Sequence, residues 1–153
     1  MKYVTRVLQP GESLVHLTRL HPIIFLPAVL WFAAAIVLLV AGLSQTGDLR
    51  IGGEALAVFC AIFGVASGTP ALIRRVTTEL AVTDRRVIYK SGVLARHTLE
   101  MNRSKVESVD VDQSLLGRML GFGTITVRGT GGSLEPIRMI GDPLTFRSHI
   151  TAG

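Results

Sequence analysis

The residue types that most often carry catalysis or bind metals are few in this chain, and they form no known motif. The four histidines lie far apart, at His16, His21, His97 and His149. They give no HExxH pair or other metal-ligand spacing, and the single cysteine, Cys60, completes neither a zinc pattern nor an intrachain disulfide. Asp110 and Asp112 would share one face of a strand, which is typical of a solvated surface. We therefore expect no enzymatic activity, no metal and no cofactor.

The arginines offer a different chemistry, the binding of anionic groups. The chain of 153 residues has a formal net charge of +5, yet it contains no recognised nucleic-acid motif, so we expect no nucleic-acid partner. Arg74 and Arg75 directly follow a long apolar run, and Arg85 and Arg86 lie one expected strand further on. We predict that Arg74 and Arg75 bind lipid headgroups, each contributing about 1 kcal/mol near an anionic surface. Arg85 and Arg86 are further candidates for the same contact, and the alternative for them is a solvated turn. The second pair would lie roughly 20–25 Å from the lipid unless the domain is tilted.

Two long uncharged segments organise the rest of the chain. Pro22 to Ser44 and Ala55 to Ile73 contain no Lys, Arg, Asp, Glu or His. As helices they would be roughly 34 and 28 Å long, close to the hydrocarbon thickness of a bilayer. A soluble helix needs a polar face, and these have none. We predict a transmembrane hairpin over residues 22–73. A signal peptide has a shorter apolar core, and a chain this small cannot bury two such helices.

Small residues recur every four positions in the second apolar segment, at Cys60, Gly64 and Gly68. The last two form a GxxxG pattern, which favours close helix packing in a membrane. The contact could lie within the hairpin or between subunits. Pro70 is expected to break or kink the helix, so that the span ends near Thr69.

The charges that flank the apolar segments predict their orientation. Lysine and arginine collect on the cytoplasmic side of membrane proteins. Lys2, Arg6 and Arg19 precede the first segment, and Arg74 and Arg75 follow the second. We therefore expect both termini in the cytoplasm and the polar loop, residues 45–54, outside.

The first 21 residues form a short region of their own. A turn at 9–12 separates two β-rich stretches, Tyr3 to Leu8 and Ser13 to Thr18, which predict two strands or a hairpin. A lone hairpin is marginal in water, so this one would dock on the C-terminal domain or on the membrane.

From Thr77 onward the sequence alternates in the manner of short strands. We expect strands near 77–83, 87–90, 93–101, 105–113, 123–128 and 134–140. Ser114 and Gly121 would cap a short helix over 115–120. Asp142 and Pro143 would begin a last helix with Pro143, Phe146 and Ile150 on one face. The prediction is an α+β chain with three regions: residues 1–21, the hairpin 22–73, and an antiparallel domain over 74–153.

Several short motifs, taken in order, resemble the membrane-anchored bacterial pleckstrin-homology (PH) domain family. They are Pro10-Gly11-Glu12, His21-Pro22, Thr83 to Ile88 (TDRRVI), Gly92-Val93-Leu94, Gln113-Ser114 with Arg118, Gly121 to Ile125 (GFGTI), and Asp142-Pro143. The resemblance covers nearly the whole chain. It implies a PH-like split barrel with a C-terminal capping helix, held at the bacterial inner membrane by two spans. Arg85, Arg86 and Lys90 do not reproduce the spaced basic motif of phosphoinositide-binding PH domains.

The resemblance also implies a function without catalysis. We expect a module for protein binding or homo-oligomeric assembly at the cytoplasmic membrane face. Its partners would be membrane lipids and either further copies of the chain or another membrane protein. Two alternatives remain: an accessory subunit of a transporter or envelope-stress system, and a lipid-handling protein or small membrane enzyme.

Overall fold

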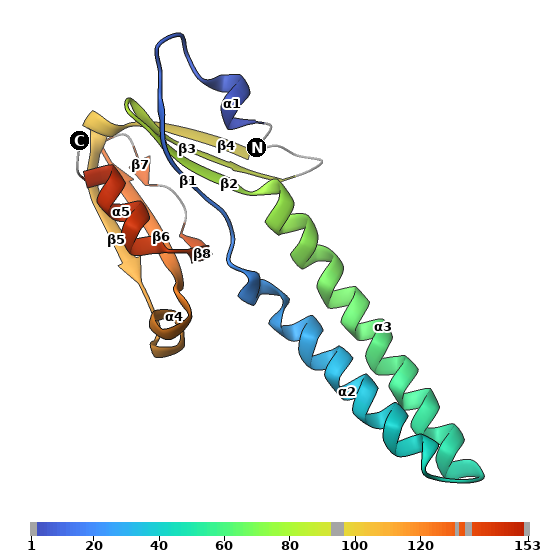
Figure 1. The fold of residues 1–153 in the computed structure, drawn as a ribbon. Helices are drawn as coiled ribbons and strands as arrows, with labels where there is room; N and C mark the ends of the chain where they lie inside the picture. Colours follow the sequence, from blue (N-terminus) through green and yellow to red (C-terminus); the bar gives the residue numbers. More distant parts are fainter. Residues whose placement is uncertain (1–2, 93–96, 131, 134–135, 152–153) are drawn as a thin grey trace. The chain divides into compact units, whose positions relative to one another are not determined.

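The computed structural model describes residues 3–92, 97–130, 132–133 and 136–151. The chain divides into two compact units, Pro22–Ile73 and a domain that joins Met1–His21 to Arg74–Gly153. The N-terminal region therefore folds with the C-terminal domain, although two long helices separate them in the sequence. Figure 1 shows the elements of both units.

The first unit is a pair of apolar helices. A 3₁₀ turn, η1 (Pro22–Phe25), leads into α2 (Leu26–Leu43), and α3 spans Asp48–Thr77. The loop between them is shorter than expected, because α3 begins at Asp48 and not after Glu54. Arg50 donates a 2.8 Å bond to Glu54 one helical turn later, and Asp48 lies in the first turn, where a carboxylate suits the helix dipole.

Of the break or kink expected at Pro70, the break is wrong, since α3 continues through this residue to Thr77. Proline removes one backbone N–H from the helix. Two hydroxyls add hydrogen bonds in the preceding turns: Ser67 donates to the carbonyl of Phe63 and Thr69 to that of Val65, both at 2.8 Å. Neither of these bonds reaches the carbonyl of Ala66, which is the one that Pro70 leaves without its backbone donor.

The domain contains two antiparallel sheets, as the alternating pattern predicts. The first has the order β1 (Leu14–Thr18), β2 (Glu79–Thr83), β3 (Arg86–Ser91), β4 (His97–Asn102). The second has the order β5 (Val106–Asp112), β6 (Phe122–Gly129), β7 (Gly132–Ser133), and β8 (Ile137–Gly141) also pairs with β6. The described parts of the strands expected at 93–101 and 134–140 correspond to β4 and β8, and residues 93–96 and 134–135 lie outside the described residues.

The two sheets are joined along one seam. Beyond β1 the chain pairs with β8: Leu20 bridges Ile140, and the Gly141 N–H donates to the carbonyl of Arg19 at 3.1 Å. At the opposite corner a 3₁₀ turn, η2 (Arg103–Lys105), connects β4 to β5 without pairing them. Among the described residues the result is a split barrel, closed between β1 and β8 and open between β4 and β5.

Helix α5 (Pro143–Thr151) packs against strands of both sheets. Pro143, Phe146 and Ile150 are its buried residues, so the predicted apolar face is confirmed. The core includes Ile125 and Val127 of β6, which are fully buried on alternate positions. Arg103 donates to the carbonyls of His149 and Ile150 at 2.9 and 3.0 Å, and so caps the last turn of α5.

The first predicted strand, Tyr3 to Leu8, is wrong. The structure has a one-turn helix, α1 (Val4–Val7), there. Its Val4 is 1% exposed and packs on Ala81 and Ile88, with Tyr3 and Leu17 beside them. The outer face of the first sheet is thus apolar, and burial of Val4 on it outweighs the strand preference of the segment. The second predicted strand is confirmed as β1.

The short helix α4 (Leu115–Leu120) lies between β5 and β6, with both predicted caps. The Ser114 hydroxyl accepts a 3.1 Å bond from the Gly117 N–H. Gly121 takes a left-handed conformation with φ of 74° and donates to the carbonyl of Gly117.

Candidate functional site

Arg86 is the centre of a buried polar network at the turn between β2 and β3. Its guanidinium donates to both carboxylate oxygens of Glu12 at 2.9 and 2.8 Å, and to Glu100 at 2.6 Å. A further bond reaches the carbonyl of Val7 at 2.8 Å. Thr83 donates to Glu12 at 2.7 Å. These bonds tie the N-terminal segment to β2, β3 and β4.

The electrostatics of this network favour its charged form. The hydrogen bond from Arg86 outweighs the effect of burial and lowers the pKa of Glu12 to about 2. The same bond raises the pKa of Arg86 above its ordinary value. Arg86 is 9% exposed and its donors are directed to protein acceptors, so its role is structural.

The other three predicted arginines do not gather into one site. Arg74 and Arg75 lie in the last turn of α3, exposed and half-buried respectively. Arg85 is exposed in the β2–β3 turn, with a 3.5 Å bond to the carbonyl of Gly11. The five residues of β2 lie between the pair Arg74 and Arg75 and the exposed Arg85. They span about 17 Å along the strand.

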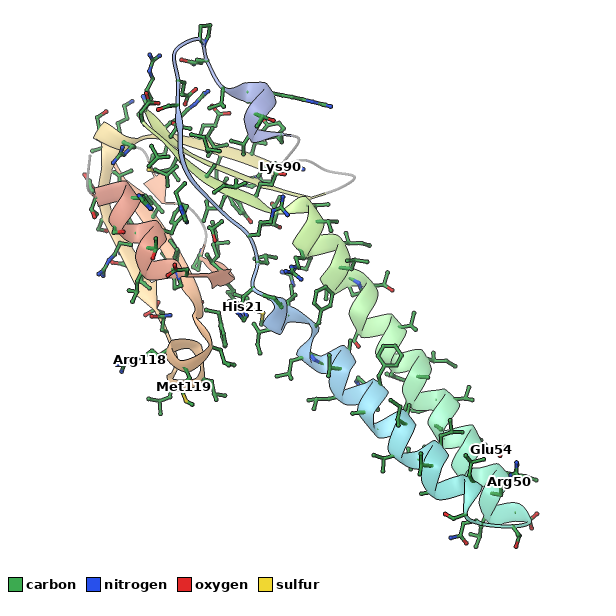
Figure 2. The ribbon with its side chains drawn as sticks, in the orientation of Figure 1. His21, Arg50, Glu54, Lys90, Arg118 and Met119 are labelled. Atoms are coloured by element: carbon green, nitrogen blue, oxygen red, sulfur yellow. The ribbon has the colours of Figure 1, made fainter. Side chains whose placement is uncertain are left out.

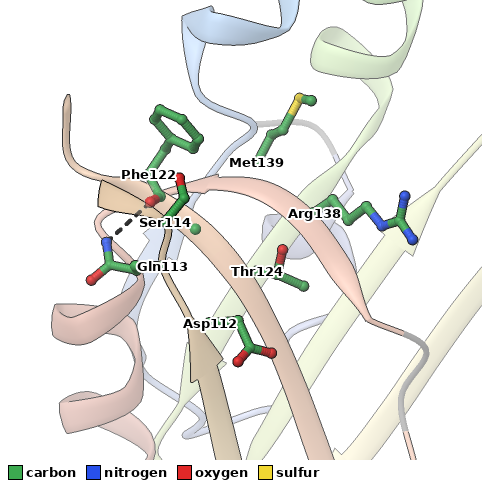
Figure 3. Close-up of a pocket in the computed structure, with 8 residues that line it drawn as sticks. Asp112, Gln113, Ser114, Phe122, Thr124, Arg138 and Met139 are labelled. Atoms are coloured by element: carbon green, nitrogen blue, oxygen red, sulfur yellow. Dashed lines mark hydrogen bonds between the residues drawn. The ribbon is translucent and has the colours of Figure 1, made fainter. Parts of the chain in front are cut away.

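Sequence reasoning missed a pocket in the second sheet. An open pocket of about 440 Å³ is lined by Asp112, Gln113, Ser114, Phe122, Gly123, Thr124, Arg138 and Met139. Figure 3 shows Gln113 beside Phe122, whose carbonyl accepts a 3.0 Å bond from the Gln113 amide, whereas Arg138 extends away from the other labelled side chains. Met139 has a positive φ of 59°, where β8 departs from regular pairing with β6.

The pocket lies next to the residue that precedes the first apolar helix. The His21 ring stacks on the Phe122 ring with centroids 5.4 Å apart, and the His21 N–H donates to the carbonyl of Met139 at 2.6 Å. This end of the domain therefore contains both the pocket and the covalent connection to η1 and α2. Among the described residues, no group of three or more His, Cys, Asp and Glu side chains could hold a metal ion.

The sequence profile of the family described as bacterial PH domain matches residues 21–152. The chain belongs to this family. The match begins at His21, so it includes both apolar helices and every strand from β2 to β8, but neither α1 nor β1. No curated protein matches the chain. PH domains are generally non-catalytic binding modules.

In this bacterial PH domain protein, the predicted stripe of small residues on α3, Cys60, Gly64 and Gly68, faces α2. Cys60 and Gly64 are buried, and a Cβ built on Gly64 would lie 3.0 Å from the Phe32 ring. A Cβ on Gly68 would lie 3.3 Å from that of Ala28. The structure thus places this stripe at a contact within the hairpin. A second close approach, Gly53 against Gly42 with 3.1 Å to its Cα, was missed because the two glycines lie on different helices.

Two histidines that the sequence leaves far apart meet in the PH domain. The rings of His16 on β1 and His149 on α5 stack with centroids 4.7 Å apart, and the Phe146 ring lies 6.2 Å from His16. Burial, and then the neighbouring His149, lower the pKa of His16, while Asp142 opposes this shift. The pair therefore favours the neutral form of His16 where α5 docks on β1.

Proposed function

We propose that this bacterial PH domain protein is a non-enzymatic, membrane-anchored module that binds another protein chain at the cytoplasmic face of the inner membrane. Pro22–Leu43 and Asp48–Thr77 are long and apolar enough to cross a membrane. In the most apolar 18-residue part of each helix, 11% of the residues of the first and 22% of those of the second are buried. Core helices of a soluble protein would be mostly buried, so an exposed apolar pair supports a lipid environment.

The charges near these helices support a cytoplasmic domain. Arg6 and Arg19 precede the first helix, and Arg74 and Arg75 end the second. At the other end of the hairpin the only basic residue in 44–54 is Arg50, at the start of α3, and it pairs with Glu54 at 2.8 Å. By the positive-inside rule, both ends of the chain remain in the cytoplasm. In this orientation Arg74 and Arg75 lie at the level of the lipid headgroups. Arg85 is separated from them by the length of β2.

The observation that carries the binding function is the open edge of β4. This strand pairs with β3 from His97↔Ser91 to Asn102↔Arg86 and ends the order of its sheet. Natural proteins often block such edges with lysine or proline. The β4 sequence, HTLEMN, contains neither, and its one carboxylate, Glu100, is held by Arg86. An extended segment of another chain can add to such an edge through backbone hydrogen bonds.

A mass measurement of the full-length protein in detergent tests this function. We expect wild-type protein to purify with more than one chain per particle, either further copies or a bound membrane protein. Thr98→Lys adds a charge to an exposed position of β4 and should reduce that association. Ser148→Lys adds the same charge to an exposed position of α5 and serves as the control. A wild-type protein that is monomeric and free of partners would contradict the proposal, as would equal association of both variants.

A further inference from the structure

Helix α4 presents an apolar surface that the domain does not cover. The exposed fractions of its four large apolar side chains are 79% for Leu115, 65% for Leu116, 82% for Met119 and 50% for Leu120. Figure 2 shows Met119 and Arg118 projecting from α4 away from the strands. Four large apolar side chains on six residues make a concentrated patch, and such patches mark interaction sites.

This surface is held rigidly by the fold. A Cβ built on Gly117 would lie 2.6 Å from the carbonyl oxygen of Phe122, so the helix packs there too closely for any side chain. The Ser114 cap and the left-handed Gly121 fix the two ends of α4. The exposed side chains are therefore presented by a defined helix.

Helix α4 lies at the end of the domain where the chain continues into the hairpin. Gly117 of α4 packs on Phe122, and the Phe122 ring stacks on His21. His21 is covalently joined to Pro22, the first residue of the apolar hairpin. The antiparallel pair Thr18↔Leu80 brings the start of β2, which follows α3, to the same end of the first sheet. Both connections to the hairpin thus leave the domain from the end that contains His21.

The charge of the surface fits an anionic partner. Residues 114–121 contain one charged side chain, Arg118, and no carboxylate. Arg118 is exposed in the last turn, next to Met119. A short apolar surface beside a cation is the composition of segments that lie in the headgroup–acyl boundary of a bilayer.

We infer that α4 is a second membrane contact: its four apolar side chains enter the cytoplasmic leaflet and Arg118 binds lipid phosphates. This rests on the proposed function, because the argument requires that the hairpin lies in a bilayer. The contact would restrict the inclination of the PH domain, since α4 and His21 belong to the same compact unit. It leaves β4 available for a protein partner.

Bromolipid quenching of tryptophan fluorescence in liposomes tests this inference on the full-length chain. Trp31 is the single tryptophan, and it reports on the hairpin in the wild-type protein. In a Trp31→Phe background, Met119→Trp reports on α4. Leu14→Trp is the matched control, because Leu14 is also an exposed apolar residue, at 39%, but lies seven residues before His21, about 23 Å along an extended chain.

We expect brominated phosphatidylcholine, mixed with phosphatidylglycerol, to quench Met119→Trp to an extent comparable with Trp31 and to leave Leu14→Trp unchanged. Quenching of Trp31 without quenching of Met119→Trp would overturn the inference and leave the anchored module intact, including the case in which a second chain covers α4. If Trp31 itself escapes quenching, the hairpin is not in the bilayer, and both proposals fail.

Discussion

The two ends of the PH domain depart from the usual distribution of residues in opposite ways. At the β2–β3 turn, charged groups are buried: Glu12 and Arg86 are each 9% exposed. At α4, apolar groups are exposed, and Met119 reaches 82%. Charged side chains are normally buried only when paired, and large apolar patches are normally covered. The first departure is explained within the chain, by the partners of Arg86, but the second is not.

The difference indicates that the two ends of the domain suit different surroundings. The Glu12–Arg86–Glu100 network completes its own hydrogen bonds and needs nothing from outside. Helix α4 lacks such a partner among the described residues, and it lies at the end from which the chain continues into the hairpin. One end is therefore built to be stable in water, and the other is suited to a surface that is itself apolar.

Of the changes that compare the two ends, the largest effect is expected at the charged end. Arg86→Met should lower the free energy of unfolding by about 3 kcal/mol, because it leaves Glu12 buried without its partner. Thermal or denaturant unfolding of the full-length protein in detergent, followed by circular dichroism, measures this loss. Arg85→Met is the control, since the neighbouring arginine is exposed and should change stability by less than about 0.5 kcal/mol. Equal losses in the two variants would show that the network does not stabilise this end.

A smaller effect is expected from the glycine that holds α4. Gly117→Ala should cost about 1–3 kcal/mol, because the new methyl group would overlap the Phe122 carbonyl and displace the helix. Gly52→Ala, in a helical position with no atom within 4 Å of the new Cβ, should be neutral or slightly stabilising. The same unfolding measurement compares the two. If Gly117→Ala is tolerated as well as Gly52→Ala, α4 does not pack as described.

Acidification should affect the charged end through Glu12. Its pKa is about 2 in the folded domain, against an ordinary 4.5, so the unfolded chain binds the proton more readily between these values. The stabilisation is complete above about pH 4.5 and is lost as the pH falls toward 2. Melting temperatures of wild-type and Glu12→Gln protein between pH 6 and 2 test this. The variant should start lower and show the shallower decline, and parallel curves would contradict the assignment.

The smallest effect on stability is expected at the apolar end. Met119→Asp should change the free energy of unfolding by less than about 0.5 kcal/mol, because the side chain makes few contacts within the domain. Phe146→Ala, at a fully buried position, should cost about 3–5 kcal/mol. A large loss from Met119→Asp in denaturant unfolding would mean that Met119 packs within the protein.

The sequence predicts the parts of the fold that depend on local patterns. The alternation of β6, the Ser114 and Gly121 caps and the apolar face of α5 each follow from neighbouring residues, and the structure confirms them. Helix α1 could not be found in this way, because Val4 is buried by Ala81 and Ile88, which come much later in the chain. Pro70 misled the prediction because apolar helices of this length can continue through a proline, as α3 does.

The candidate site was less predictable than the fold. The network around Arg86 depends on Glu12, which is 74 residues away in the sequence. The sequence therefore provided no reason to treat Arg85 and Arg86 differently, although Arg85 is exposed and Arg86 is buried. The exposure of α4 was equally hidden, because a Leu-Leu-Gly-Arg-Met-Leu segment has the same composition in a core as on a surface. The uncharged apolar segment that begins at Pro22 predicted the hairpin, but nothing local predicted the stacking of His21 on Phe122.

Labelling of single cysteines tests most directly whether the hairpin crosses the membrane and holds the PH domain inside the cell. In a Cys60→Ala background, Thr46→Cys places a thiol between the two helices and Ser148→Cys places one on α5. A maleimide that cannot cross membranes should label Thr46→Cys in intact spheroplasts and Ser148→Cys only after lysis. Labelling of Ser148→Cys in intact spheroplasts, or protection of Thr46→Cys until lysis, would contradict the account.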